Sequence, residues 1–497
     1  MMNPKDKKRK EQVAHIIEIP DEYRLVVDDQ EGVDDPYHLL WWGHKEDEEK
    51  KIQITLNRHT GNLFEFRIDD ENYFSSDKEV IEENKVREIA NVFIKKYVEE
   101  RLEFYTYVSI KDDWRGWKEI NYMQEVNGYP LPDTGCVVRV HPSGNVVNFR
   151  YNGGESIQEK PLWPSEIVDE NIVLKNLKAR QDMRLVFVDL TFSSCVYENG
   201  GEVKGYHLLY EPEPVHASIH ASTGKDLFGP NHYKLPPTVA VTKPKKGGQQ
   251  GDIFDLFDWD KDSFTKVAET ENEDEIRMGF VLKEELQKQK EEKNPYLMNE
   301  FFKKHLPMLK YNNLVGITMD KSTNELIGFI KLTDDKEAKQ ILSREECLQK
   351  ALQFLEHVIP DVTQYFRLWD ERDEDEGIER FVFSVYMNGI PVEYREFMVN
   401  INTENGAVMH YSGKPSNIIE ELLAHETAPK VTKEKALEIY REAIRVKLEW
   451  YLEHDTEEMK YELLYKQTTN ENHKEPFDCS REIRYMDAHT GEKIWSK

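Results

Sequence analysis

The chain is 497 residues long, which is too long for one hydrophobic core and predicts two or more domains. Hydrophobic residues make up 38 % of it, enough to fill cores, which argues against a globally disordered chain. Acidic side chains outnumber basic ones by 95 to 67, and the resulting net charge of −28 would repel phosphate backbones. We therefore expect no nucleic-acid partner.

The targeting signals and the cysteines indicate a compartment. No segment approaches the roughly 20 apolar residues of a membrane span. The basic start, MMNPKDKKRK, is not followed by the apolar stretch of a signal peptide. Cys136, Cys195, Cys347 and Cys479 are far apart and form no C-x-x-C, which suits a reducing compartment. The sequence thus predicts a cytoplasmic protein without a membrane span.

Two strand pairs open two similar stretches of the chain. Apolar residues alternate with polar ones over 51–66 around a turn at Thr60-Gly61-Asn62. The same pattern covers 315–330, with a turn near Ser322-Thr323-Asn324. Alternation with a period of two around Gly and Asn predicts half-buried antiparallel hairpins.

Each hairpin is followed by an amphipathic helix. Apolar residues recur at spacings of three and four over 86–97 and again over 348–359. Ser343-Arg344-Glu345-Glu346 fits the capping box that begins such a helix. Further helices are expected near 168–177 and from Thr432 onward, each followed by strands.

Short segments of the two halves repeat each other. VNGYP at 126–130 recurs as MNGIP at 387–391, an offset of 261 (389 − 128). YHLLY at 206–210 recurs as YELLY at 461–465, and ASTG at 221–224 recurs as AHTG at 488–491. The offset grows from 255 (461 − 206) to 267 (491 − 224), so about 12 residues are inserted near 468–479. These matches indicate an internal duplication.

The repeated segments carry a resemblance to known families. MDAHTGEKI at 486–494 resembles the closing strand and turn of the PepSY domain, and IHASTGK at 219–225 is a looser match. The paired arrangement and the Asn-Gly-x-Pro strand resemble the YcdB/YcdC-type repeated-domain proteins over most of 20–230 and 296–497. The resemblance implies tandem PepSY-like modules, in a wider group that includes propeptides that inhibit and chaperone secreted metalloproteases.

We therefore expect an α+β fold of duplicated pairs of PepSY-like modules, each one helix packed on a short antiparallel sheet and preceded by a β-hairpin. The expected segments are an N-terminal hairpin region (16–80), modules 1 and 2 (81–155 and 164–230), a linker and acidic segment (231–295), a second hairpin region (296–340), and modules 3 and 4 (341–415 and 430–497).

No motif assigns a catalytic residue, a cofactor or a metal. G-x-S-x-G, H-E-x-x-H, the P-loop and G-x-G-x-x-G are all missing, and His425-Glu426-Thr427 lacks a second histidine at the needed spacing. His216 and His220 are four apart in a predicted strand, where they would lie about 13 Å apart, too far to share an ion.

Two acidic segments are candidate cation sites. In 258–269, Asp258, Asp260, Asp262 and Glu269 occupy positions 1, 3, 5 and 12 of a calcium loop. Lys266 and a serine at the glycine position favour an acidic linker instead. The run 370–376 is expected to be an exposed loop, with a patch for cations or a basic partner as the alternative.

The paired tryptophans could serve a binding surface or the core. Trp41 and Trp42 are adjacent, and Trp114 lies close to Trp117. Aromatic residues in strand-rich regions mostly fill cores, which favours the second interpretation.

Three functions remain open. The first is a non-enzymatic interaction protein that binds another protein or a peptide, because sheets offer grooves and edge strands while catalytic motifs are missing. The second, implied by the resemblance alone, is a protease-regulating protein, either an inhibitor or chaperone-like. The third is an enzyme whose site is assembled from scattered residues, such as paired carboxylates, between the two halves.

Overall fold

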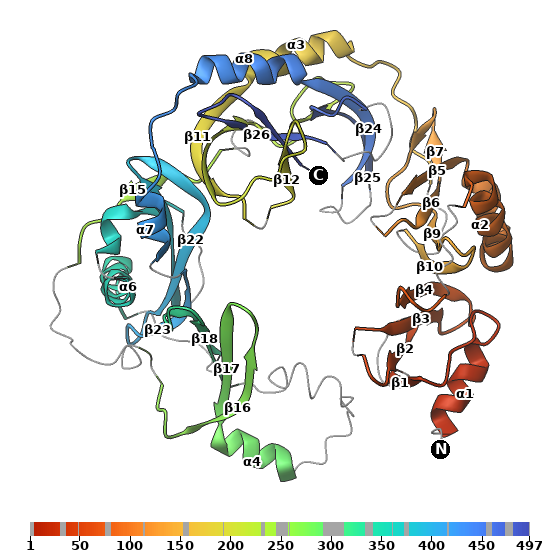
Figure 1. Ribbon diagram of the computed structural model, residues 1–497, viewed down its shortest axis with the longest axis horizontal. Helices are drawn as coiled ribbons and strands as arrows, with labels where there is room; N and C mark the ends of the chain where they lie inside the picture. Colours follow the sequence, from red (N-terminus) through yellow and green to blue (C-terminus); the bar gives the residue numbers. More distant parts are fainter. Residues whose placement is uncertain are drawn as a thin grey trace.

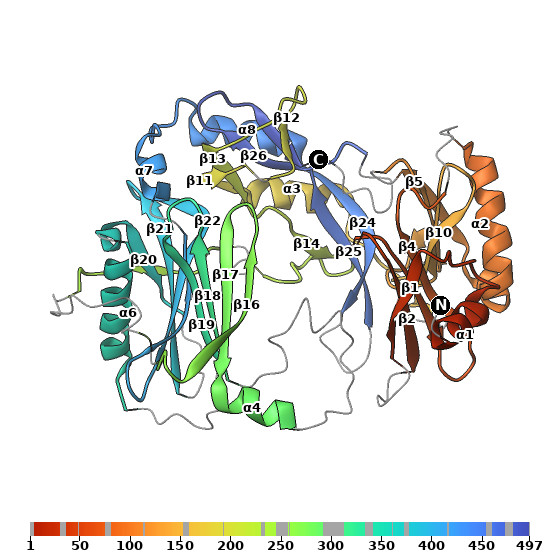
Figure 2. The same ribbon diagram turned by 60° about the horizontal axis from the view of Figure 1, so that its bottom comes forward.

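The computed structural model describes residues 4–29, 36–47, 49–74, 81–112, 115–152, 159–191, 193–229, 234–244, 257, 259–291, 313–332, 341–359, 361–371, 377–414, 417–453, 460–472 and 481–496. The elements form an arch (Figure 1). A sheet of the first repeat lies at one end and a sheet of the second repeat at the other. Helices α3 (Glu170–Arg180) and α8 (Lys433–Ala443) with their strands join them, in a part that we call the junction (Figures 1 and 2).

The first-repeat sheet has eight antiparallel strands in the order β1-β2-β3-β4-β10-β9-β6-β5. Its predicted hairpin is confirmed as β3 and β4, and the predicted helix as α2, whose Val86, Ala90 and Ile94 are fully buried against the sheet. The elements are α1 (Pro4–Val13), β1 (Tyr23–Asp28), β2 (Tyr37–His44), β3 (Lys51–Asn57), β4 (Leu63–Asp69), α2 (Glu83–Val98), η1 (Glu99–Phe104), β5 (Tyr107–Asp112), β6 (Lys118–Met123), β9 (Cys136–Val140) and β10 (Val146–Tyr151).

The second-repeat sheet follows the same order, strand for strand: β16-β17-β18-β19-β23-β22-β21-β20. Strand β15 adds one strand beyond β20. The predicted capping box is confirmed, because Ser343 and Glu346 exchange hydrogen bonds at the start of α6. The elements are β15 (Thr238–Ala240), β16 (Phe264–Glu271), β17 (Glu275–Leu282), α4 (Lys283–Glu291), β18 (Leu314–Asp320), β19 (Leu326–Leu332), α6 (Arg344–Val358), η3 (Val362–Tyr365), β20 (Phe366–Trp369), β21 (Ile378–Met387), β22 (Ile390–Asn402), β23 (Val408–Ser412) and α7 (Asn417–Leu423).

In the junction, strands of the two copies are exchanged. Helix α3 of the first copy packs on β24 and β25 of the second, whereas α8 of the second copy packs on β11 and β13 of the first. Strand β14 pairs with β25, β26 with β13, and β12 with β27. The strands are β11 (Asp182–Asp189), β12 (Cys195–Tyr197), β13 (Tyr206–Glu213), β14 (Ser218–His220), β24 (Arg445–Glu453), β25 (Lys460–Thr468), β26 (Ile483–Asp487) and β27 (Lys493–Ser496).

The repeated motifs meet each other across this exchange. The Ala221 amide, in the first Ala-x-Thr-Gly turn, donates to the Leu463 carbonyl in the second Tyr-x-Leu-Leu-Tyr strand at 2.8 Å. Reciprocally, the Ala488 amide donates to the Leu208 carbonyl at 3.0 Å. The closing tyrosines behave alike: Tyr465 Oη donates to the Val168 carbonyl at 2.9 Å, and Tyr210 Oη donates to the Val431 carbonyl at 2.8 Å. The motifs therefore recur because each copy completes the other.

The two Asn-Gly turns connect each sheet to the junction. Both pairs adopt left-handed backbone, with φ of 53° and 81° at Asn127 and Gly128, and 52° and 82° at Asn388 and Gly389. Such a turn joins short antiparallel strands, β7 (Glu125–Val126) with β8 (Tyr129–Pro130), and β21 with β22. Beyond the first turn, Leu131 is buried with residues of α3 and β24.

The expected α+β class is wrong. The structure is mostly β, with sheets of eight and fourteen strands and few helices, rather than short separate sheets that each carry a helix. The hairpins expected to precede the modules are continuous with the module strands in one sheet. Periodicity in the sequence reports the buried face of a strand but does not report which distant strand completes the sheet.

The segment 231–295, expected as a linker and an acidic run, contains β15, β16 and β17. Its acidic stretch supplies part of β16, the turn and the start of β17 at the sheet edge. The other expected boundaries stay a prediction. None of the helices in the described ranges is both long enough and apolar enough to cross a membrane.

Candidate functional site

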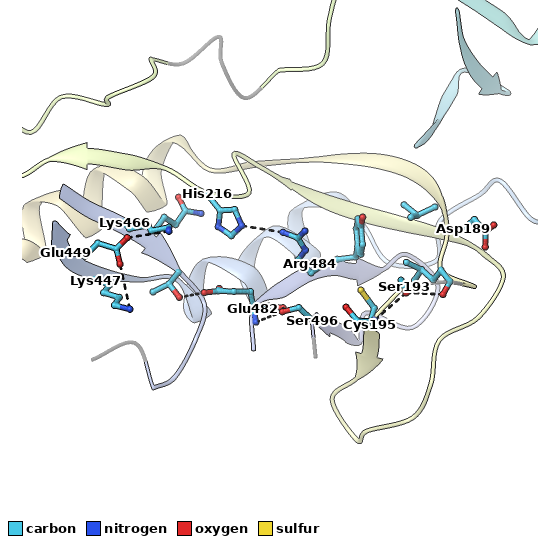
Figure 3. A pocket seen from close by; sticks show the side chains of 16 residues that line it. Asp189, Ser193, Cys195, His216, Lys447, Glu449, Lys466, Glu482, Arg484 and Ser496 are labelled. Atoms are coloured by element: carbon cyan, nitrogen blue, oxygen red, sulfur yellow. Dashed lines mark hydrogen bonds and ion pairs between the residues drawn. The ribbon is translucent and has the colours of Figure 1, made fainter. Parts of the chain in front are cut away.

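A pocket of about 720 Å³ lies in the junction where the two copies interlock. The first copy contributes the end of β11, the start of β12 and the turn before β14, and the second contributes β24, β25, β26 and the end of β27. Figure 3 shows a charged group at one end, His216 and Arg484 in the middle, and Ser193 and Cys195 at the other end. The lining residues are Val188, Asp189, Leu190, Ser193, Ser194, Cys195, His216, Lys447, Glu449, Lys466, Gln467, Thr468, Glu482, Arg484, Tyr485 and Ser496.

Glu482 in this pocket has a structural role. Its carboxylate accepts hydrogen bonds from the Thr468 hydroxyl and from the amide and hydroxyl of Thr469, the latter two at 2.6 and 2.7 Å. Its own amide donates to Ser496 Oγ at 3.0 Å. These bonds join the end of β25 to the start of β26 and to β27, so most of the carboxylate's acceptor capacity is already used.

Arg484 faces the pocket and, among the described residues, uses only one of its hydrogen-bond donors. Its Nη1 lies 3.3 Å from Nε2 of His216. Because a guanidinium can only donate, Nε2 is the acceptor and the imidazole is neutral with its proton on Nδ1. Burial lowers the pKa of His216; the charge of Glu482 opposes this shift, and Arg484 and Lys466 add to it. Arg484 forms no ion pair with a carboxylate among the described residues.

The remaining charges leave the pocket slightly basic. Glu449 lies 3.4 Å from Lys466 and 3.7 Å from Lys447, so one carboxylate serves two ammonium groups. Asp189 is paired outside the pocket with Arg395 at 2.5 Å. With Asp189 neutralised in this way, three cations face two anions, a net charge of +1 in a chain of −28.

A second, smaller pocket of about 190 Å³ lies where β11 and β13 meet β22. Arg184 forms ion pairs there with both Glu211 and Glu393. Burial, then the neighbouring Glu393, raises the pKa of Glu211 to about 8, and Arg184 opposes the shift. One guanidinium cannot neutralise both carboxylates, which agrees with the raised pKa of Glu211.

The acidic calcium candidate is not assembled in the described part of the chain. Asp260 accepts from Ser263 and from the Asp262 amide, and Lys266 pairs with Glu269. Glu269 lies in β16, five residues or about 17 Å along the strand from its first residue. Asp258 lies outside the described residues. No group of three or more potential ligands among the described side chains is placed to hold a metal ion.

The other candidates lie apart from one another. His216 lines the large pocket, whereas the Nδ1 atom of His220 accepts from the Ser222 amide in the turn after β14. His425 contacts the Glu421 carbonyl through Nδ1 at 2.8 Å. Of the run 370–376, only 370 and 371 are described, and the Glu371 carbonyl accepts from Arg344 at 3.3 Å.

The tryptophans divide between the core and its rim. Trp42 is fully buried and donates to Asp6 at 3.0 Å, and Trp117 is 4 % exposed beneath the Arg115 guanidinium. Trp41 is partly exposed, with the Lys51 ammonium 5.4 Å from its ring. Trp114 lies outside the described residues.

Sequence reasoning missed the pocket because its residues are scattered and form no motif. One signal pointed toward it. The offset between the copies changes after the Tyr-x-Leu-Leu-Tyr strand, and the insertion near 468–479 begins with Thr468 and Thr469, which bind Glu482 at the pocket.

Comparisons with known proteins agree with the duplication. The family model described as the YcdB, YcdC repeated domain matches residues 6–153 and 275–415. Protein YcdB of Bacillus subtilis (strain 168) is 25 % identical over 98 % of this chain and 97 % of its own length, and YcdC of the same strain is 24 % identical over 90 % and 92 %. Among solved structures, the C-terminal domain of YpeB from Bacillus megaterium matches 49 % of this chain and 92 % of its own, with 14 % identity and a TM-score of 0.24.

Proposed function

We propose that this chain, which belongs to the YcdB, YcdC repeated-domain family, is a non-enzymatic binding protein whose junction pocket holds the carboxylate of an acidic peptide. The observation that carries the proposal is Arg484. Its guanidinium faces the pocket, and its only hydrogen bond among the described residues goes to the neutral ring of His216.

The chemistry of the pocket suits an anionic group. Arginine presents donors in a fixed fork that matches the two oxygens of a carboxylate, and such bonds are stronger than neutral ones. Lys466 and Lys447 lie in the same pocket, and among the described residues their shared ion-pair partner is Glu449. A ligand carboxylate would complete the charge balance that the protein leaves open.

The size and construction of the pocket suit a short peptide. A volume of about 720 Å³ falls in the range of roughly 300–1,000 Å³ that is typical of small-molecule sites. Figure 3 shows its polar side chains spread along a line rather than gathered at one point. An extended segment with its carboxylate at Arg484 would reach the hydroxyl and thiol groups at Ser193 and Cys195.

Two finer statements belong to the same proposal. We also propose a peptide or protein partner, which the basic pocket supports, and a cytoplasmic location, which the free thiols at Cys136, Cys195 and Cys347 support. The division of the chain into PepSY-like segments stays a prediction. Among the described residues, no contact favours the protease-regulating role that the resemblance implies.

Calorimetric titration tests the proposal by comparing an acidic tripeptide with the same tripeptide whose carboxylates are amidated. Loss of a charge-assisted hydrogen bond pair predicts that Arg484→Gln weakens binding by about 10- to 150-fold. The matched control is Arg277→Gln, an exposed arginine of β17 that pairs with Glu275 and lies outside the pocket. Equal affinity of the two variants, or equal binding of amidated peptides, would contradict the proposal.

The enzyme alternative is separated by the fate of the peptide. It requires a pocket with converging polar groups between the two halves; the junction pocket lies between the halves, but its polar side chains are spread along a line. Recovery of the peptide unchanged after prolonged incubation supports binding, whereas cleaved or modified peptide supports catalysis.

A further inference from the structure

The two repeat sheets end in equivalent edge strands, and only one of these is covered within the described residues. In the second-repeat sheet the edge strand β20 pairs with β15, a short strand from the segment between the repeats. In the first-repeat sheet the equivalent strand is β5, which ends the sheet with no further strand beside it in the described ranges. Strand β15 is thus an example, within this chain, of a segment that pairs with such an edge.

Strand β15 is held by backbone pairing and two side chains. Val239 stands opposite Leu368, and the Asp370 amide donates to the Pro237 carbonyl at 2.7 Å. Arg367 donates to the Thr238 carbonyl at 3.2 Å. Farther along, Lys243 forms an ion pair of 2.5 Å with Asp361. Even-numbered residues of β20 therefore turn their backbone groups toward the added strand.

The direction in which the backbone groups of β5 point can be traced from the hairpin of β9 and β10 in the same sheet. The His141 amide donates to the Asn145 carbonyl, so the backbone groups of His141 point from β9 toward β10. Backbone groups alternate along a strand, so those of Val138 point the other way, toward its partner Ile120 on β6.

The same alternation continues to β5. Because Ile120 faces β9, its neighbour Asn121 faces β5 and pairs there with Ser109. The residues on either side of Ser109, Val108 and Ile110, therefore direct their amide and carbonyl groups away from the sheet. Val108 stands opposite Tyr122, as Leu368 stands opposite Phe383 in the other repeat.

Burial agrees with an uncovered edge at β5. Leu368, whose strand is covered by β15, is only 7 % exposed. Val108 and Ile110 pack against the core of the first repeat but are only partly buried. An added strand would cover both side chains and pair their outward backbone groups.

We propose that β5 takes up an extended segment of a partner protein, antiparallel to Val108–Ile110, in the way that β20 takes up β15. The segment that fits is uncharged, carries small or β-branched side chains like those of Thr238-Val239-Ala240, and is flanked by proline. A basic residue after it, in the position of Lys243, suits a chain with a net charge of −28. This surface is separate from the junction pocket.

The probe is a synthetic peptide with the sequence of residues 235–244, LPPTVAVTKP, added to the full chain. Hydrogen–deuterium exchange should show new protection at the Val108 and Ile110 amides. Protection confined to β20, which would mean exchange with the chain's own β15, or no protection at all, would overturn the proposal. Protection at β5 without peptide, in step with dimerisation on concentration, would assign the edge to a second copy and also overturn it.

Two changes sharpen the test. Ile110→Pro removes an outward amide that β6 does not use, a substitution that edge strands tolerate, and should weaken peptide binding by about tenfold. The control leaves the protein unchanged and places proline at the peptide position of Val239, which should abolish binding through loss of the central pair. Undiminished binding in either case refutes strand addition, and the peptide control holds even if the protein variant does not fold.

Discussion

A buried pair of glutamines gives the sharpest test of the strand exchange in the junction. Gln181 follows α3 in the first copy, and Gln467 lies in β25 of the second; the two are 2 % and 1 % exposed. Gln467 Nε2 donates to Gln181 Oε1 at 3.0 Å across 286 positions of sequence. We predict that Gln467→Leu destabilises the junction and that its effect depends on Gln181.

The magnitude follows from what the substitution leaves behind. Leucine keeps the volume but removes the donor, so the buried Gln181 Oε1 loses its partner, a cost of about 1–3 kcal/mol. Gln181 Nε2 keeps its bond of 2.9 Å to the Pro214 carbonyl. The double variant with Gln181→Leu lacks the orphaned oxygen as well. The two single losses of stability should therefore sum to about 1 kcal/mol more than the loss in the double variant.

Native-state hydrogen exchange at the amides of β25 and α3 measures the opening free energy of the junction itself. The control pairs Gln467→Leu with Thr55→Val, a buried position in β3 of the first-repeat sheet, and should be additive within about 0.5 kcal/mol. Equally additive behaviour of the Gln181 and Gln467 variants would refute the contact between the copies, and with it the exchanged arrangement.

Three further predictions follow from other contacts. The raised pKa of Glu211, about 8 against an ordinary value of 4.5, means that the folded state keeps a proton that the unfolded state loses, so stability falls as the pH rises through that window. Glu211→Gln should flatten this fall in thermal melts between pH 5 and 8.5. An unchanged slope of melting temperature against pH would exclude Glu211 as its source. Gly135→Ala places a Cβ 1.8 Å from a backbone carbonyl oxygen and should cost at least about 3 kcal/mol, whereas Gly128→Ala, with open space and the same positive φ, should cost about 1–2 kcal/mol in urea denaturation. Tyr465→Phe removes the bond to the Val168 carbonyl and should cost about 1 kcal/mol; no loss of opening free energy would contradict a role for the repeated tyrosine.

Local features of the fold were predictable from the sequence. The hairpin at 51–66, the helix that begins after Ser343 and the helix capped by Thr432 form where pattern and capping chemistry placed them. Each depends on residues a few positions apart, so the short-range code is sufficient.

The candidate site was not predictable in the same way. His216 and Arg484 are 268 positions apart and become neighbours only because β14 of one copy and β26 of the other belong to the same junction. No spacing rule links such residues; the sequence pattern relates His216 only to His220, four positions away.

The amino-acid sequence by itself determined that two copies exist and which short segments they share, because turns, caps and buried faces are encoded locally. The tertiary structure alone decided that the copies exchange hairpins, since strand pairing depends on which backbone edges meet in space. The same exchange creates the pocket around Arg484. Strand β15 covers the edge strand β20 of the second repeat, whereas the equivalent strand β5 of the first repeat has no added strand in the described ranges. The reason is physical: a backbone edge carries the same donors and acceptors whatever its sequence, so the partner is selected by packing of the whole chain.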